Sequence, residues 1–281
     1  MIKKFFSFLL TLVIIVLLLA LGLGIFVKVK YDVNVITAIP GVFKVTKEVD
    51  ESTYKSSFTQ EDKLLVKDAI NDKLNNFITY SEQDGFGINI LPSSSISDEI
   101  KLTSKEVGAL SDILLDVSDT HTVDISGYSI PFKLIQVEMN NIENGSCTLN
   151  TVLKLDITSI KAGMKSFPLN LISNKIPDNI YVSSVVRVNK LTPAYSYSVV
   201  SESISINSLS GNETYEMFKL LSIVADFGNI DELNLSFGTT FVNALIGSSS
   251  KAGFAYSLQL YGATDYNFEI ETETNYFVVK N

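Results

Sequence analysis

The hydrophobic pattern divides the chain into one uninterrupted apolar run and a long region of regular alternation. The run extends from Phe5 to Val27 and contains no charged residue. A helix of that length would span roughly 35 Å, which is enough for a hydrocarbon core of about 30 Å. A cleaved export signal usually has an apolar core of only about 7–15 residues. The run therefore predicts a transmembrane helix retained as a signal anchor, with cleavage near Ala20, Gly22 and Gly24 as the alternative.

Lysines flank the run on both sides, so the distribution of positive charge favours neither orientation in the membrane. Lys3 and Lys4 precede it, and Lys28 and Lys30 follow it. Long domains cross membranes largely regardless of their charge, and we therefore expect the short tail, residues 1–4, to stay in the cytoplasm. The sequence predicts a single-pass protein of the cell membrane with an extracytoplasmic C-terminal part.

Residues 28–57 predict a stalk that contains one strand or short helix. After it, a helical period marks three segments. Each begins with a hydroxyl residue and, three positions later, an acidic residue, a pattern that satisfies free N–H groups at a helix start. The pairs are Thr59 with Asp62, Thr103 with Glu106, and Ser210 with Glu213. The apolar stripes that follow are Val66, Ile70, Leu74 and Phe77; Val107, Leu110, Leu114 and Val117; and Met217, Leu221 and Val224. We predict about three amphipathic helices whose stripes pack into a core.

A period of two marks antiparallel strands between and after these helices. Residues 132–139 and 148–157 flank Asn144-Gly145, a pair suited to the positive φ angles of a tight turn, and predict a hairpin. Four further segments alternate in the same way and predict strands with one solvated face. They are residues 181–188, 195–206, 254–260 and 266–270.

The two periods together define the fold class. We predict an α+β fold in which the transmembrane helix, residues 5–27, precedes a mainly antiparallel β-sheet domain at residues 58–281. The apolar segment 159–177, which Pro168 interrupts, predicts a broken helix or a loop that covers the sheet. The pattern leaves open whether the domain has one core or two subdomains that meet near residue 208.

The net charge of the chain bears on whether the protein binds nucleic acid. Setting aside Lys3, Lys4, Lys28 and Lys30 leaves 18 of the 22 basic residues against 31 acidic ones, which is a net charge of −13 beyond the anchor. Such a surface repels phosphate backbones and anionic headgroups. We therefore expect no nucleic-acid partner.

Only one histidine, His121, and one cysteine, Cys147, are available for chemistry. A Ser-His-Asp triad or a Cys-His dyad would need His121, and no G-x-S-x-G elbow accompanies it. A zinc site needs three or four ligands of the His and Cys type. We interpret His121 as a loop residue and Cys147 as a free buried thiol.

Short matches to catalytic motifs occur without their companions. Ser248 to Lys251 fits S-x-x-K, Ser205 to Asn207 fits S-x-N, and Lys161 to Gly163 resembles K-T-G, but the chain order is reversed. Asp226 to Gly228 matches D-F-G with no glycine-rich loop. The adjacent carboxylates Glu61 and Asp62, Asp98 and Glu99, and Asp231 and Glu232 are interpreted as solvated charges. The sequence thus predicts no catalytic, cofactor-binding or metal-binding residue.

Aromatic residues gather in the strand-rich segments and are interpreted as core packing. They are Tyr195, Tyr197, Tyr256, Tyr261 and Tyr266. A concave apolar groove under the 159–177 segment is the alternative.

Part of the chain resembles a known family. The segments "LTSKEVGALSDILL", "SFPLNLISNKIPDNIYVSSVVRVN" and "YSYSVVSESISINSL", with Pro168 and Pro177 nine residues apart, are similar to the YpmS-like membrane-anchored proteins of Gram-positive bacteria over residues 100–210. The resemblance implies an extracytoplasmic α+β domain on one membrane span, and it implies no functional residues.

These observations favour a non-enzymatic binding or scaffold module of the cell envelope. Its expected partners are the lipid bilayer, through the N-terminal helix, and an envelope protein or lipid that the sequence does not identify. No cofactor is expected. The alternatives are a lipid- or amphiphile-binding domain with an apolar groove, and a cell-envelope hydrolase.

Overall fold

The computed structural model describes residues 28–47, 49, 51–89, 95–96, 98–118, 121–125, 128–163, 175–222 and 229–281. Within these ranges its helices are α2 (Val35–Val45), η1 (Glu51–Tyr54), α3 (Gln60–Leu74), α4 (Ser104–Val117), α5 (Thr158–Gly163), α7 (Gly211–Ser222), α8 (Ile230–Leu245), α9 (Phe254–Ser257) and η2 (Leu258–Tyr261). Its strands are β1 (Ile78–Ser81), β2 (Gly85–Ile88), β3 (Ile100–Thr103), β4 (Thr122–Ile125), β5 (Tyr128–Glu143), β6 (Ser146–Asp156), β7 (Asn179–Lys190), β8 (Tyr197–Ile206), β9 (Asp265–Glu271) and β10 (Thr274–Lys280). The fold is α+β, as the sequence predicts. The apolar run 5–27 lies outside the described residues.

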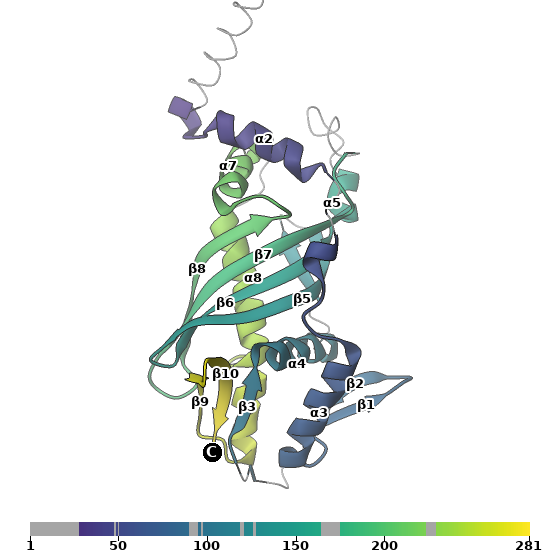
Figure 1. Ribbon diagram of the computed structural model, residues 1–281, viewed down its shortest axis with the longest axis vertical. Coiled ribbons are helices and arrows are strands. Elements are labelled where there is room, and N and C mark those ends of the chain that lie inside the picture. Colours follow the sequence, from purple (N-terminus) through teal and green to yellow (C-terminus); the bar gives the residue numbers. More distant parts are fainter. Residues whose placement is uncertain are drawn as a thin grey trace, which may run out of the picture.

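The centre of the molecule is an antiparallel sheet in which five strands follow one another in the order β4-β5-β6-β7-β8 (Figure 1). The predicted hairpin forms its middle, and its turn at Asn144 and Gly145 has φ angles of 50° and 73°. The strands predicted at 181–188 and 195–206 are β7 and β8. Local alternation and turn chemistry therefore identified most of the central sheet correctly.

The three predicted helix starts are confirmed by reciprocal capping. In α4 the Thr103 N–H donates to Glu106 Oε2 at 2.7 Å, and the Glu106 N–H donates back to Thr103 Oγ1 at 3.4 Å. The same exchange opens α3 and α7. The predicted stripe of α4 is only partly buried, since Val117 at its end is 38% exposed. Val224 lies outside the described residues.

The strand predicted at residues 254–260 is wrong. This segment forms α9 and η2, in which Phe254, Leu258 and Tyr261 are buried. Phe254 and Leu258 are four residues apart, a spacing that satisfies a period of two and a helical period equally. The following strand, predicted at 266–270, is present as β9 in a three-stranded sheet of order β3-β10-β9.

Helix α8 packs along one face of the central sheet and is not among the predicted helices (Figure 1). Its Asn234 side chain reaches the β-bulge of β7 and β8 next to Val185, where the register shifts. The Asn234 Nδ2 donates to the oxygens of Val185, Ser201 and Ser203 at 2.8–3.0 Å, and its Oδ1 accepts from Ser184 Oγ at 2.6 Å. One buried amide thus satisfies polar groups of two strands.

Glycine allows α8 to approach the sheet closely. Gly238 lies one helical turn after Asn234, and a Cβ at this position would lie only 2.4 Å from Val186 Cγ1. Val186 is 1% exposed and belongs to the main core, whose residues come from both halves of the chain, from Val45 to Val279. Helix α8 therefore packs closely against β7, because Gly238 has no side chain that would collide with Val186.

The opposite face of the central sheet is partly covered by the segment predicted as a stalk. Tyr54 of η1 stacks on Tyr181 of β7 with ring centroids 4.4 Å apart, and the Ser57 N–H donates to the Ile135 carbonyl at 3.0 Å. Val152 of β6 joins this second cluster. As a result β6 is buried on both faces along much of its length, although its alternation predicted one solvated face.

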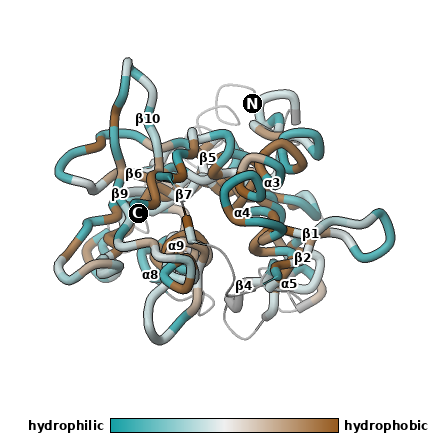
Figure 2. The backbone as a smooth tube through the Cα atoms, turned by 90° about the horizontal axis from the view of Figure 1, so that it is seen from below, coloured by the Kyte–Doolittle hydropathy of each residue, from teal (hydrophilic) through white to brown (hydrophobic). Residues whose placement is uncertain are grey.

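The elements at the end of the molecule remote from α2 complete the fold. The β1–β2 hairpin projects from the body beside α3 and α4, and its tip is hydrophilic (Figure 2). The C-terminus also lies at this end, whereas α2 and α7 occupy the other (Figure 1). The long axis of the molecule therefore separates the α2 end from the C-terminal end.

We predict that Gly238→Ala lowers the free energy of unfolding measured in denaturant. Overpacking against the stiff Val186 side chain costs about 1–3 kcal/mol, and the better helix propensity of alanine offsets at most about 1 kcal/mol of that cost. Gly211→Ala is the matched control, because a Cβ there would lie 3.6 Å from its nearest neighbour. Equal stability of the two variants would contradict the close packing, as would additivity of Gly238→Ala with Val186→Ala.

Candidate functional site

Helix α2 forms one end of the molecule and rests on α7 (Figure 1). Its Ala38, Gly41 and Val45 are buried at helical spacing. A Cβ on Gly41 would lie 3.4 Å from both the Glu213 carbonyl oxygen and Met217 Cβ, so the glycine allows the two helices to approach closely. One side of α2 is therefore fixed to the domain.

Polar contacts at both ends of α2 strengthen this attachment. Asn34 caps the helix, since its Oδ1 accepts from the Ile36 N–H at 3.2 Å, and its own N–H donates to the Glu216 carboxylate of α7. Lys44 pairs with Glu213 at the other end. Lys219 of α7 also pairs with Asp32, with 3.1 Å between Nζ and Oδ2.

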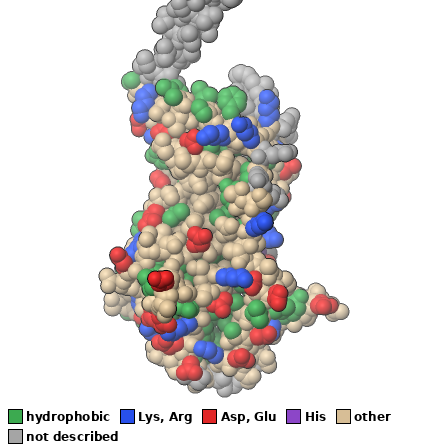
Figure 3. Space-filling model, in the orientation of Figure 1, with side chains coloured by type: hydrophobic (Ala, Val, Ile, Leu, Met, Phe, Trp, Pro, Cys, Tyr) green, Lys and Arg blue, Asp and Glu red, His purple; other side chains and the backbone are tan. Residues whose placement is uncertain are grey.

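The side of α2 opposite α7 is apolar and exposed. Ile36, Ile39 and Phe43 lie three and four residues apart and are 80%, 48% and 65% exposed. We call these three side chains the α2 apolar face. Hydrophobic side chains gather at this end of the molecule in Figure 3. An exposed apolar patch of this kind usually marks a site of interaction with a protein, a membrane or a ligand.

Basic residues accompany this face. Residues 28–47 contain the four lysines Lys28, Lys30, Lys44 and Lys47 and the single acidic residue Asp32, although the whole chain has a net charge of −9. Lys28 pairs with Asp32 at 2.8 Å, and both side chains are largely exposed. The α2 end thus combines exposed apolar surface with a local excess of positive charge.

Sequence reasoning missed the α2 apolar face because residues 28–57 were assigned to a stalk. A signal was present, since Asn34 is a good N-cap and the apolar residues after it keep helical spacing. Pro40 lies inside the helix and conceals the pattern.

His121 belongs to a cluster of titratable side chains together with Lys63, Asp112 and Asp116. Lys63 of α3 pairs with the buried carboxylate of Asp112 on α4. His121 Nε2 lies 3.5 Å from Asp112 Oδ1, and His121 Nδ1 lies 3.2 Å from Asp116 Oδ1. The cluster joins α3, α4 and the residue before β4, so His121 has a structural setting that its loop position did not predict.

Electrostatics in this cluster favour an ionised Asp112. Burial by itself would raise the pKa of the Asp112 carboxyl, but contacts from His121 and Lys63 outweigh burial and leave this pKa below its usual value. The ionised carboxylate therefore serves as a partner for Lys63 and His121.

Cys147 is remote from His121. The Phe132 N–H donates to the His121 carbonyl, and Phe132 pairs with Leu155 of β6, whereas Cys147 lies eight residues earlier on that strand. At about 3.3 Å per residue this separates the two sites by roughly 26 Å. Cys147 is fully buried, and burial raises the pKa of its thiol. The two residues do not form a dyad.

The short motif matches are not brought into one site by these contacts. Ser248 and Lys251 exchange backbone hydrogen bonds within one tight turn. Lys161 pairs with Asp178, and Asn207 Oδ1 accepts from the Tyr181 N–H at 2.8 Å. Asp226 to Gly228 lie outside the described residues. In the part of the chain that the structure describes, no three His, Cys, Asp or Glu side chains are grouped to hold a metal ion.

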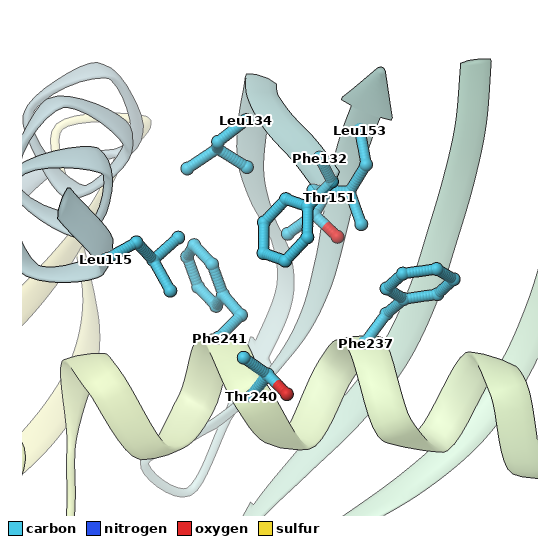
Figure 4. A pocket seen from close by; sticks show the side chains of 8 residues that line it. All are labelled: Leu115, Phe132, Leu134, Thr151, Leu153, Phe237, Thr240 and Phe241. Carbon is cyan, nitrogen blue, oxygen red and sulfur yellow. The ribbon is translucent and has the colours of Figure 1, made fainter. Parts of the chain in front are cut away.

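An apolar cavity lies between α8 and the central sheet (Figure 4). Its lining comes from α4, α8, β5 and β6 and consists of Leu115, Phe132, Leu134, Thr151, Leu153, Phe237, Thr240 and Phe241. Its volume is about 10 Å³, which is about the space that one water molecule needs. Because an acyl chain is many times larger, this cavity does not provide the predicted apolar groove. The 164–174 part of the predicted cover lies outside the described residues.

We predict that Asp112→Asn lowers the free energy of unfolding at pH 7 by about 3 kcal/mol, because it leaves Lys63 without its buried partner. A carboxyl whose pKa is lowered by folding stabilises the protein at neutral pH, and this contribution is lost as the pH falls below the unfolded value near 3.8. Denaturant unfolding from pH 7 to pH 3 should therefore show a shallower decline for the variant than for the unmodified protein.

Asp68→Asn is the control for this measurement, because Asp68 pairs with Lys67 while 65% exposed. An exposed pair of this kind contributes no more than about 1 kcal/mol. Equal losses in the two variants, or an unchanged acid slope in Asp112→Asn, would show that the cluster does not stabilise the fold.

Comparison with known proteins identifies no relative of this chain. Among the described residues, no helix has the length and apolar character needed to cross a bilayer. The chain matches no protein-family model, no curated protein and no solved structure.

Proposed function

We propose that the protein is a single-pass membrane protein whose folded domain is held at the extracytoplasmic surface by the run Phe5–Val27. The observation that carries this proposal is the direct succession of an uncharged 23-residue run, from residue 5 to residue 27, and the α2 end of the domain. Membrane helices need about 20 predominantly apolar residues. The run meets that requirement before any acidic residue of the chain occurs.

The position of α2 supports a definite arrangement at the membrane. Eight residue steps separate Val27 from Val35, the first residue of α2. Even a fully extended chain covers at most about 28 Å over that distance. A tether ending at Val27 would therefore keep α2 beside the bilayer and direct the C-terminal end of the domain away from it.

We propose a non-enzymatic role, in which the domain binds or organises partners of the cell envelope. The two side chains of the chain that are best suited to nucleophilic or acid–base chemistry have structural contacts: His121 lies against Asp112 of α4, and Cys147 is buried. Tethering would raise the local concentration of the domain for partners near the membrane. The acidic surface disfavours nucleic acid as a partner.

The same placement agrees with kinship to the YpmS-like proteins. The described parts of the segments that carry this resemblance fall mainly on α4, β7 and β8, which contribute to one core, whereas residues 166–174 lie outside the described residues. The small cavity beside α8 gives no support to an amphiphile-binding role at that position.

Fractionation of cells that produce the full chain tests the tether. We predict that the protein remains in the membrane pellet after washing at alkaline pH, with an intact mass that includes residues 1–27. Ile14→Arg combined with Leu18→Arg should release it, because arginine at the centre of a membrane helix costs about 2.5–3.5 kcal/mol per residue. Ile14→Ala combined with Leu18→Ala is the matched control and should stay in the pellet.

Added protease should cleave the domain on intact cells from which the wall has been removed. Recovery of the unprocessed chain from the soluble fraction would refute the tether. Protection of the domain until the membrane is permeabilised would instead refute the orientation.

A further inference from the structure

The α2 apolar face points to a second contact with the same membrane. We propose that α2 lies flat in the interfacial region of the bilayer, with Ile36, Ile39 and Phe43 among the outer parts of the acyl chains. The occupant of this face is therefore lipid. This inference rests on the proposed tether, because Phe5–Val27 is what would bring the bilayer to α2.

Both sides of α2 are apolar, and only one of them is covered. Ala38 and Val45 pack toward α7 with 0% and 8% exposure, whereas Ile36 and Phe43 on the opposite side are 80% and 65% exposed. Apolar side chains on two sides of a helix are typical of an element that lies between two apolar surroundings, such as a protein interior and lipid. Since α7 covers one side of α2, the exposed side is suited to contact with a second apolar phase.

The position of this face in the chain selects lipid as that phase. Residues 28–34 are the only link between the apolar run and α2, and residues 28–31 within it are helical, which shortens its reach. The link therefore keeps the α2 apolar face close to the membrane surface whenever the run is inserted. A separate protein partner would have to displace lipid that is already adjacent.

Charge around the helix is complementary to lipid headgroups. Four lysines precede or follow the apolar face in the chain, namely Lys28, Lys30, Lys44 and Lys47, and two of them have carboxylate partners, since Lys28 pairs with Asp32 and Lys44 with Glu213. The carboxylates that face α2 from α7 are Glu213 and Glu216, and they are engaged by Lys44 and by the Asn34 N–H. Interfacial helices combine an apolar face with lysines in the same way, and they bind anionic lipids more strongly than neutral ones.

This contact would orient the whole domain. Gly41 seats α2 against Met217, and the pairs Lys44–Glu213 and Lys219–Asp32 fix its ends on α7. Because α2 moves with the domain, embedding its apolar face would set the tilt of the long axis as well as its distance from the bilayer. A flexible stalk would leave both free.

Site-directed spin labelling of the full chain in lipid nanodiscs tests the inference. The native Cys147 is fully buried, with its thiol pKa raised, so an introduced surface cysteine can be labelled selectively. Ile36→Cys, Ile39→Cys and Phe43→Cys place the label on the apolar face. Leu260→Cys is the matched control, because Leu260 is 62% exposed at the remote end of the domain.

We expect labels at positions 36, 39 and 43 to collide several-fold more with oxygen than with a water-soluble nickel complex, whereas a label at position 260 should favour the nickel complex. Discs containing a quarter of phosphatidylglycerol should show the effect more strongly than discs of phosphatidylcholine alone. Labels on the apolar face that are as open to nickel as the control would overturn the inference.

The outcomes separate this inference from the tether. A chain that enters nanodiscs but shows water-exposed labels on α2 retains the tether and loses the interfacial helix. A chain that does not enter nanodiscs loses both. Protection that occurs only with two chains in one disc, accompanied by dipolar broadening between their labels, would assign the face to a second copy and overturn the lipid assignment.

Discussion

The fold depends on the close contact between helix α8 and the bulged strands beneath it. A β-bulge leaves an extra residue and interrupts the ladder, and the interruption between β7 and β8, at Val185 and Val186, lies next to Asn234. The amide of Asn234 reaches the backbone oxygens of Val185 and Ser203 at 3.0 Å, so polar groups near the bulge are satisfied in a buried place. An apolar residue at this position could not do so, because buried backbone groups without partners are costly.

The contact between α8 and the bulged strands connects the two ends of the molecule. The N-terminal part of α8 is anchored at the bulge, and Gly238 lets the helix descend onto Val186. Further along, Phe241 and Leu245 continue the same core toward α9, whose Phe254 packs near Phe77 with ring centroids 6.0 Å apart. A single core therefore links the α7 end to the C-terminal sheet, and α2 is carried on a rigid support.

The features that are suited to a function lie on the surface at the α2 end of the molecule and not in its interior. The interior is closely packed, and its charged residue Asp112 serves to hold α3, α4 and His121 together. The α2 end differs because it combines exposed apolar side chains with lysines. A domain that acts by its position at a membrane needs this kind of surface more than it needs a cleft.

The sequence by itself determined the features that depend on neighbouring residues. Capping at Thr59, Thr103 and Ser210 marked three helix starts correctly because the interacting groups are only three positions apart. The Asn144-Gly145 turn and the alternation around it identified the central hairpin for the same reason. The charge balance is likewise a property of composition.

Tertiary structure decided everything that depends on distant partners. The sequence did not predict helix α8, because Asn234 and Gly238 have a structural role only where they contact β7 and β8 near the bulge. The apolar positions of the segment that begins at Phe254 fit both a period of two and a helical period, and the segment is helical because of how it packs in the folded chain. The attachment of α2 to α7, the second covered face of β6 and the pairing of Lys63 with Asp112 all join residues far apart in the chain. Local patterns cannot encode such contacts, because their free energy arises only when the chain has closed the long loops between them.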